Sequence, residues 1–257
     1  MGIAAFSTKL MSGQRQVETA TVVCPTGAIT TGGDIEATMT SAILGGGTEV
    51  VTVAVLLGDT TAQVAQKIVA ALNLNADFLA HFVATFDGVD VITTAILPAA
   101  NEVAQNLALA VVGPCAGMTA APTSADTFDG IAYTEIANAG NFTGPALSVD
   151  VVDVTSHDST SGFEEVVPTI LRTGELRMDI NYEPDDATHD ATTGILFRYL
   201  NSILGAYQLR FPDAGHTEFT FNAYVTSFEP GMPHAGKISA PVTFKIDGVP
   251  TLTDTWV

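Results

Sequence analysis

Three side chains that could form a catalytic triad stand next to one another in the chain. They are Ser156, His157 and Asp158, within the stretch DVTSHDSTSGFEEVVP at 153–168. A triad needs its nucleophile, base and orienting acid within hydrogen-bond reach of one another. Consecutive residues on a strand point to opposite faces, so these three would splay apart. In a turn, Asp158 and Ser159 would bond to their own backbone instead. The spacing therefore disfavours a triad.

A metal site is the second chemistry that these residue types allow. His157 and Asp158 could combine with a later pair, His189 and Asp190, because imidazole and carboxylate groups are common metal ligands. No HExxH or CxxC spacing accompanies them, and the chain has neither a G-x-S-x-G motif nor a P-loop. We therefore expect no metal, no cofactor and no enzymatic activity.

Cys24 and Cys115 are the two cysteines of the chain, too few for a tetrathiolate metal site. A disulfide between them is one alternative. Free, buried thiols are the other, and synthesis in a reducing cytoplasm favours them.

Composition excludes several classes of function. The chain has 257 residues, 47% of them hydrophobic, and a formal net charge of -19 with nine Lys and Arg in total. Proteins that grip nucleic acid or anionic membranes do so with basic residues, so both classes are disfavoured. The start of the chain lacks the pattern of a secretory signal, and the longest apolar run, Val50–Leu57, is too short to span a bilayer. We expect a soluble protein made in the cytoplasm.

The segment 16–125 differs from the rest, being crowded with Ala, Val, Thr and Gly. Its alternating apolar residues predict strands near 35–39, 51–55 and 106–112, and the Asp87-Gly88 pair predicts a hairpin turn. A capping box at Thr60 and Gln63 opens a predicted helix, and a second short helix is expected at Asp77–Phe82. The sequence therefore predicts a small α+β module, whose expected core is Val51, Val53, Val55, Val64, Ile68, Leu72, Phe78 and Phe82.

From Phe128 onward the pattern is that of longer strands with one apolar and one polar face. One example is GELRMDINY at 174–182, and similar alternation recurs near 219–225 and 238–246. A single helix is expected to start near Thr188 and to end before Gly205, with Leu196, Tyr199, Leu200 and Ile203 as its apolar stripe. The predicted fold class is mainly β: an antiparallel sandwich or barrel with one helix, plus the inserted α+β module.

Several motifs resemble the major tail proteins, or tail tube proteins, of long-tailed non-contractile bacteriophages. They are GIAAFSTKL, YTEIANAGNFTGPALSVDVVDVTSHDSTSGFEEVVPTILRTGEL, PDDATHDATTGILFRYL, YQLRFPD, FNAYVTSFEPGMP and KISAPVTFKIDGVPTL. The resemblance implies a discontinuous tail-tube domain at 1–15 and 127–257. The intervening module, 16–126, departs from the family pattern and is expected on the tube exterior. Gly2–Met11 is then expected to pair with Gly130–Ile136 across the module.

The resemblance also implies an assembly. Hexameric rings of this chain would stack into a hollow tube in the virion tail, through which double-stranded DNA passes without specific binding. The tape measure protein, the tail terminator and the tail tip proteins are the implied partners.

The long segment around 156–172 is expected to be a docking loop that reaches the adjacent ring, as the resemblance implies. The apolar content of the segment supports this expectation, because loops this long and apolar usually contact another protein surface. The alternative is a loop that folds back on its own sandwich. The candidate contact residues are His157, Asp158, Phe163, Glu164, Val166, Val167, Ile170, Leu171 and Arg172.

The resemblance implies that the sheet containing the strand after the docking loop lines the channel, so the polar strand faces are the candidate lumen wall. Acidic faces suit that role, since a DNA conduit should avoid cationic sticking points. The alternative is an ordinary solvated sheet face. Arg177 is expected to pair with Glu175 or Asp179. The lumen-facing candidates are Asp150, Glu175, Arg177, Asp179, Asn181 and Glu218.

A second function class is a surface module that binds host-cell glycans through the insert. Against it, the insert has few aromatic residues, and Phe78, Phe82 and Phe86 are interpreted as core. Exposed tyrosine or tryptophan would favour it, and the single tryptophan, Trp256, lies near the end of the chain.

Overall fold

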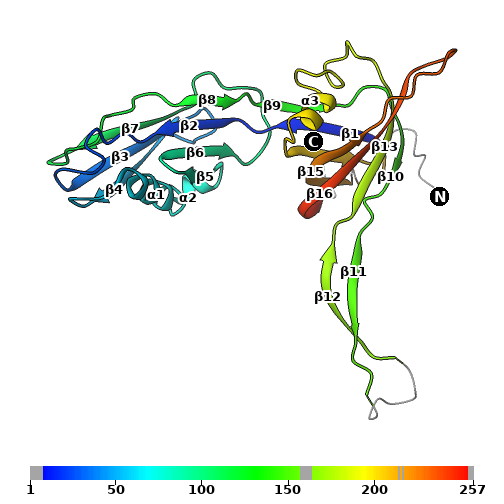
Figure 1. Ribbon diagram of the computed structural model, residues 1–257, viewed down its shortest axis with the longest axis horizontal. Coiled ribbons are helices and arrows are strands. Elements are labelled where there is room, and N and C mark those ends of the chain that lie inside the picture. The colour runs from blue at the N-terminus through cyan, green and yellow to red at the C-terminus, as the bar shows by residue number, and fades with distance from the viewer. Residues whose placement is uncertain (1–7, 157–163, 214, 216, 254–257) are drawn as a thin grey trace. The chain divides into compact units, whose positions relative to one another are not determined.

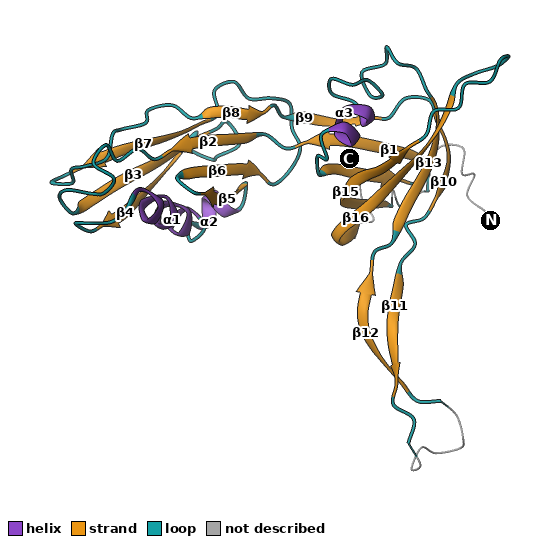
Figure 2. Cartoon of the chain, in the orientation of Figure 1, coloured by secondary structure: helices purple, strands orange, loops and turns teal. Residues whose placement is uncertain are grey.

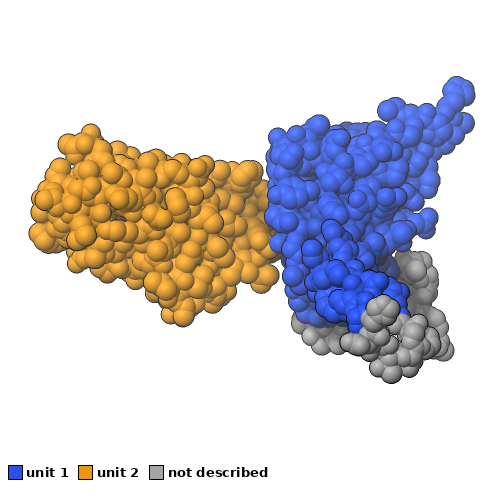
Figure 3. Space-filling model, turned by 60° about the horizontal axis from the view of Figure 1, so that its bottom comes forward, with its two compact units in different colours: residues 1–12, 133–257 blue, residues 13–132 orange. Residues whose placement is uncertain are grey.

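The computed structural model describes residues 8–156, 164–213, 215 and 217–253. The chain divides into two compact units, which Figure 3 colours separately: unit 1 is 1–12 with 133–257, and unit 2 is 13–132. Unit 2 thus begins earlier and ends later than the predicted module at 16–126. The fold is mainly β with antiparallel sheets and few helices, as the strand patterns predict.

Unit 1 is built on one seven-stranded antiparallel sheet with the strand order β10-β13-β16-β15-β14-β1-β9 (Figure 1). Its strands are β1 Lys9–Gln14, β9 Ile131–Glu135, β10 Ala139–Thr143, β13 Glu175–Asn181, β14 Gly205–Arg210, β15 Glu218–Phe228 and β16 Ser239–Thr253. Strand β1 lies beside β9, and the Ile136 N–H donates to the Leu10 carbonyl at 2.9 Å. The expected pairing across the module is therefore confirmed for the described residues.

The alternating residues of these strands form the core of unit 1. On β13, Leu176, Met178 and Ile180 are all at most 1% exposed. They pack with Tyr207, whose ring meets Phe244 edge-on at 5.0 Å between centroids. The apolar face predicted for 174–182 is thus the buried face of the sheet.

Helix α3, Ile195–Leu200, is shorter than the predicted helix. The Asp190 carboxylate accepts hydrogen bonds from the backbone N–H groups of Thr192, Thr193 and Gly194, which holds the preceding residues in a turn. Short polar side chains compete with helices in this way. The buried residues of α3 are Ile195 and Arg198, whereas Leu200 is 63% exposed, so the predicted apolar stripe is wrong.

Unit 2 contains two antiparallel sheets and two helices (Figure 2). The sheet orders are β5-β6-β2-β8 and β4-β3-β7. The elements are β2 Val17–Thr21, β3 Gly33–Thr40, β4 Thr48–Val55, α1 Thr61–Leu72, α2 Ala76–Leu79, β5 Phe82–Asp87, β6 Asp90–Ala95, β7 Asn106–Val112 and β8 Ala125–Phe128.

The structure of unit 2 confirms most of the local sequence signals in this segment. Thr60 and Gln63 form the predicted capping box of α1, and the chain reverses at Gly88 between β5 and β6. The expected core residues lie in one cluster, with Val51 at its margin. Two predictions fail: Phe82 begins a strand instead of ending a helix, and Phe86 is 46% exposed and not core.

Cys24 and Cys115 are both free and buried. Burial raises the pKa of the Cys115 thiol, which keeps the thiol protonated and unreactive. Of the two alternatives, the structure has the free thiols.

Candidate assembly surfaces

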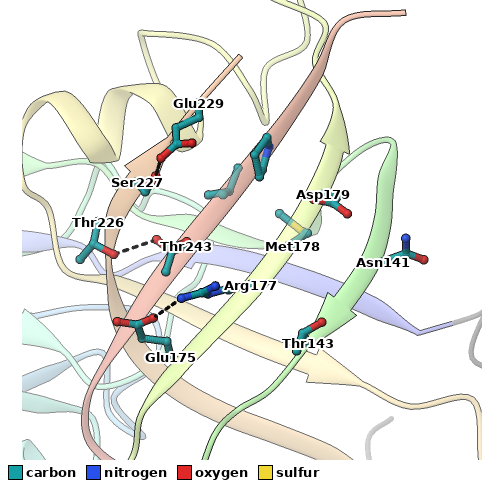
Figure 4. Close-up of a pocket in the computed structure, with 12 residues that line it drawn as sticks. Asn141, Thr143, Glu175, Arg177, Met178, Asp179, Thr226, Ser227, Glu229 and Thr243 are labelled. Atoms are coloured by element: carbon teal, nitrogen blue, oxygen red, sulfur yellow. Dashed lines mark hydrogen bonds and ion pairs between the residues drawn. The ribbon is translucent and has the colours of Figure 1, made fainter. Parts of the chain in front are cut away.

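The polar face of β13 carries four of the predicted lumen residues. Glu175, Arg177, Asp179 and Asn181 alternate with the buried residues of the strand, and Arg177 and Asp179 are exposed. Figure 4 shows Glu175, Arg177 and Asp179 at a depression of about 600 Å³ that also involves β10, β15 and β16. Its lining includes Asn141, Thr143, Thr226, Ser227, Glu229 and Thr243.

Arg177 forms an ion pair with Glu175, with Nη2 and Oε2 3.3 Å apart, as expected. Both side chains are largely solvated, so the pair adds little stability and mainly masks the cation. A second cation on this face is not predicted by the sequence analysis. Lys245 on β16 stands directly opposite Glu175 in the β13–β16 register and is exposed. The face is therefore mixed in charge, with carboxylates beside two cations.

Glu218 does not behave as an exposed wall residue. It is 8% exposed and lies opposite Arg210 in the β14–β15 register, with the Arg210 Nε 3.3 Å from its Oε2. The Thr253 hydroxyl donates to its other carboxylate oxygen at 3.3 Å. The expectation that this is an exposed sheet position is wrong, because its neighbours on the same face cover it.

Asp150 lies in a different sheet from the other lumen candidates. It belongs to strand β11, Ser148–Asp153, which pairs only with β12, Val166–Arg172, among the described residues. Its carboxylate accepts a hydrogen bond from the Arg172 Nε at 2.8 Å, and this bond lowers the pKa of Asp150. The structure therefore does not bring Asp150 to the β13 face.

The predicted docking loop is a β-hairpin and not a loop without strands. Strands β11 and β12 pair antiparallel with an irregularity between Val149 and Val151. The apolar run 166–172 lacks a local strand signal, because Pro168 interrupts it and its partner strand lies upstream. Figure 1 shows the two strands side by side, apart from the seven-stranded sheet. His157, Asp158 and Phe163 lie outside the described residues.

This hairpin is apolar and exposed. Every residue of β12 is exposed, and so is every residue of β11 except Asp150. Ile170 is 57% exposed and Leu171 is 82% exposed. The other exposed apolar residues are Val149, Val151, Val152, Val166 and Val167. The alternative in which this segment folds back on its own sandwich does not hold for the described residues.

Both faces of the hairpin carry apolar residues. The register places Val149 opposite Leu171 on one face and Val152 opposite Val167 on the other, because residues an odd number of positions apart on a strand point to opposite faces. The Arg172–Asp150 ion pair lies on the face of Val152 and Val167. Glu164 lies just before β12 and is exposed.

The seven-stranded sheet ends in strands β10 and β9, and no other strand among the described residues pairs with their outer sides. Such edges present unpaired backbone N–H and C=O groups to any strand that approaches. Unit 1 therefore offers both an exposed hairpin and two open sheet edges.

The second His-Asp pair is structural. His189 is fully buried, its Nδ1 accepts from the Glu183 N–H at 3.2 Å, and its Nε2 lies 2.8 Å from the Ala137 carbonyl oxygen. The Asp190 carboxylate is occupied by the turn that precedes α3. Within the described ranges no group of three or more His, Cys, Asp or Glu could hold a metal ion. No helix of the described chain is long and apolar enough to cross a membrane.

These features define a mainly-β protein whose notable surfaces are suited to protein contacts. No family model matches the chain, and no curated protein matches it. Among solved structures, the chain is similar to one from the tail of an empty GTA particle, with 19% identity and a TM-score of 0.40, covering 47% of this chain and 86% of that chain.

Two further similar structures come from contractile systems. One is a sheath–tube complex of an extracellular contractile injection system, PVC, with 14% identity and a TM-score of 0.34, covering 45% of this chain and 80% of that one. The other is the anti-feeding prophage baseplate, with 9% identity and a TM-score of 0.36, covering 47% and 83%. These structures include contractile systems and do not single out the non-contractile class.

Proposed function

We propose that this chain is a structural subunit of a bacteriophage tail tube and has no catalytic activity. The observation that carries the proposal is the β11–β12 hairpin, which exposes apolar residues on both faces. A two-stranded hairpin alone in water is marginally stable, and contiguous exposed apolar surface marks a contact site. A neighbouring subunit that covers this hairpin would stabilise it.

The open edges of the seven-stranded sheet support the same proposal. Strands β10 and β9 lie at opposite ends of the sheet, so each subunit can give one edge to a neighbour and receive another. Contacts of this head-to-tail kind generate rings when the rotation between neighbours closes. We propose hexameric rings, as the sequence resemblance implies, stacked through the hairpin into a tube.

The proposed lumen wall is the polar face of β13. Asp179 and Glu229 would repel DNA phosphates. The ion pair between Glu175 and Arg177 masks the arginine cation, while Lys245 remains as a cation opposite Glu175. The net charge of -19 keeps the subunit from binding DNA strongly elsewhere. Double-stranded DNA would then pass during ejection without being held.

The remaining parts of the proposal follow from this role. The subunit would be made in the host cytoplasm and reside in the virion tail. Its partners would be copies of itself, the tape measure protein, the tail terminator and the tail tip proteins. Unit 2 would decorate the tube exterior.

No observation favours glycan binding by unit 2. A depression in that unit, lined by Leu44, Gly45, Gly46, Glu49, Asp77, Ala80 and His81, has no tyrosine, tryptophan or phenylalanine in its lining. Rigid aromatic side chains are the usual anchors of such sites.

Electron microscopy of the purified full-length protein tests the proposal directly. We expect hollow tubes of stacked rings, or single rings at low concentration. A protein that stays monomeric at every concentration and in the presence of the implied tail partners would contradict it.

A further inference from the structure

Unit 2 has four strands at sheet edges, and three of them are closed or very short. At β5, the Asn73 side chain bonds to both backbone groups of Ala84: its Nδ2 donates to the carbonyl at 2.8 Å and its Oδ1 accepts from the N–H at 3.0 Å. This amide occupies the place that another strand would take. Proteins close edges in such ways because an open edge invites pairing with another chain.

The edges at β7 and β8 are also protected. Leu109 of β7 exchanges two backbone hydrogen bonds with Ala121, at 2.7 and 2.9 Å. Further along β7, the Asn106 side chain accepts from the Ser124 N–H. Strand β8 is only four residues long, and short edge strands are a known form of protection.

Strand β4 is the exception. It is eight residues long, and among the described residues no backbone group or side chain bonds to its outer backbone groups. Its outward side chains at Thr48, Val50, Thr52 and Ala54 are exposed. From Val50 to Gly58 the sequence has neither a charge nor a proline. A long, uncharged, β-prone edge of this kind is a template for strand addition.

We propose that β4 is a docking edge for β4 of a second copy of this chain, with the two strands antiparallel. The strand is complementary to itself in the register centred on Thr52. Thr52 then stands opposite Thr52 of the second copy, Val50 opposite its Ala54, and Val51 opposite its Val53. The exposed faces of the two sheets lie on the same side, and so do the buried faces. Such threonine and β-branched pairs stabilise antiparallel strands.

Charge placement is consistent with this register. Glu49 is the only charged residue of β4, and it would face Val55 of the second copy rather than another carboxylate. Its own carboxylate already accepts a hydrogen bond from Asn75 at 2.7 Å. Pairing therefore places no like charges directly opposite each other.

This contact is two-fold symmetric and so differs from the head-to-tail contacts proposed for a ring. It does not depend on the tail-tube proposal. Unit 2 has two basic residues, Arg15 and Lys67, against eleven acidic ones, so two copies repel each other at long range. Salt screens that repulsion, and added salt should strengthen the pairing.

The test uses the full chain carrying Ile170→Asp, which removes the proposed hairpin contact. Hydrogen exchange of the β4 amides is followed at low and high protein concentration, and the mass is measured by sedimentation. We expect a dimer at high concentration, in which the outward β4 amides exchange more slowly. Exchange in α1 reports whether unit 2 remains folded.

A matched pair of variants locates the contact. Thr52 and Ala110 stand on either side of Glu36 on the same exposed sheet face, one on β4 and the other on β7. Thr52→Lys sets two lysines opposite each other and should raise the dimer dissociation constant by roughly fivefold or more. Ala110→Lys should leave it unchanged. Exchange at β4 that does not vary with concentration, or equal weakening by both variants, would overturn the proposal.

Discussion

Glu18 on β2 stands directly opposite Asp126 on β8, and Glu18 is 2% exposed. The Gln16 amide lies between the two carboxylates, with its Nε2 3.2 Å from Glu18 and 3.5 Å from Asp126. The Ser124 hydroxyl donates to the second Glu18 oxygen at 2.6 Å. Two acids and two neutral partners thus join the strand that enters unit 2 to the strand that leaves it.

The free energy of unfolding of unit 2 should fall as the pH rises through the pKa of Glu18. Burial raises the pKa of Glu18, and the nearby Asp126 charge adds to that rise, against the hydrogen bonds from Ser124 and Gln16. The folded state therefore binds a proton at a pH where the unfolded state has released it. Ionising the buried Glu18 therefore destabilises the folded state. This penalty is absent below the pKa of Glu18 in the unfolded chain and fully present above its pKa in the folded protein.

Glu18→Gln should remove this penalty, because the amide is neutral and can donate to Asp126. We expect a higher melting temperature at neutral pH and a flatter pH profile above pH 5, measured by thermal unfolding from pH 4 to 8. Asp34→Asn, at an exposed carboxylate on β3, is the control and should leave the profile unchanged. An unaltered profile in Glu18→Gln would show that Glu18 is ionised at no cost.

Tube assembly should depend on the hairpin. Ile170→Asp would place an unpaired carboxylate in the proposed contact, and burying such a charge is costly. We expect folded subunits with an unchanged melting temperature but few tubes in micrographs. Val103→Asp is the control, since Val103 is an exposed apolar residue of unit 2. Normal tubes from Ile170→Asp would remove the hairpin from the interface.

The charge of the proposed lumen can be inverted without touching the core. Glu175→Lys with Asp179→Lys should leave the fold intact, because both positions lie on the solvated face of β13. Tubes of this variant should bind DNA in low salt and release it in high salt, as counterion release requires. Asp34→Lys with Glu36→Lys makes the same change in charge on unit 2. Equal DNA retention by the two variants would place the β13 face outside the channel.

Glu218 should not tolerate the same substitution. Glu218→Lys would set a lysine against Arg210 in a nearly buried site and leave Thr253 without its acceptor. We expect a loss of roughly 3 kcal/mol in the free energy of unfolding, the typical cost of breaking a buried ion pair. Denaturant unfolding measures it. A loss near zero would show that solvent reaches the pair freely.

Unit 2 should fold by itself. Its core is separate from that of unit 1, and both its sheets are complete within 13–132. Residues 13–132 expressed alone should give a dispersed amide spectrum and a cooperative melt. A chain lacking this unit, with 12 joined to 133 by a short glycine linker, should still form tubes. Collapsed, undispersed peaks from the isolated unit would show that it depends on unit 1.

The sequence by itself determined the elements whose signals are local. The alternation of Leu176, Met178 and Ile180 marks the buried face of β13, and the capping box at Thr60 marks the start of α1. The turn at Gly88 marks the β5–β6 hairpin. In each case neighbouring residues supply the periodicity, the cap or the backbone freedom, and these act within a few residues of chain.

Only the tertiary structure decided the features that depend on partners distant in sequence. Glu218 sits on a strand face that reads as polar and exposed, but Arg210 and Thr253 cover it once β14 and β16 are in place. The run from Val166 to Arg172 becomes a strand only because β11 pairs with it across the intervening segment. Residue periodicity carries no information about which distant segment supplies a strand's hydrogen bonds, and pairing and burial therefore emerge only when the chain is folded.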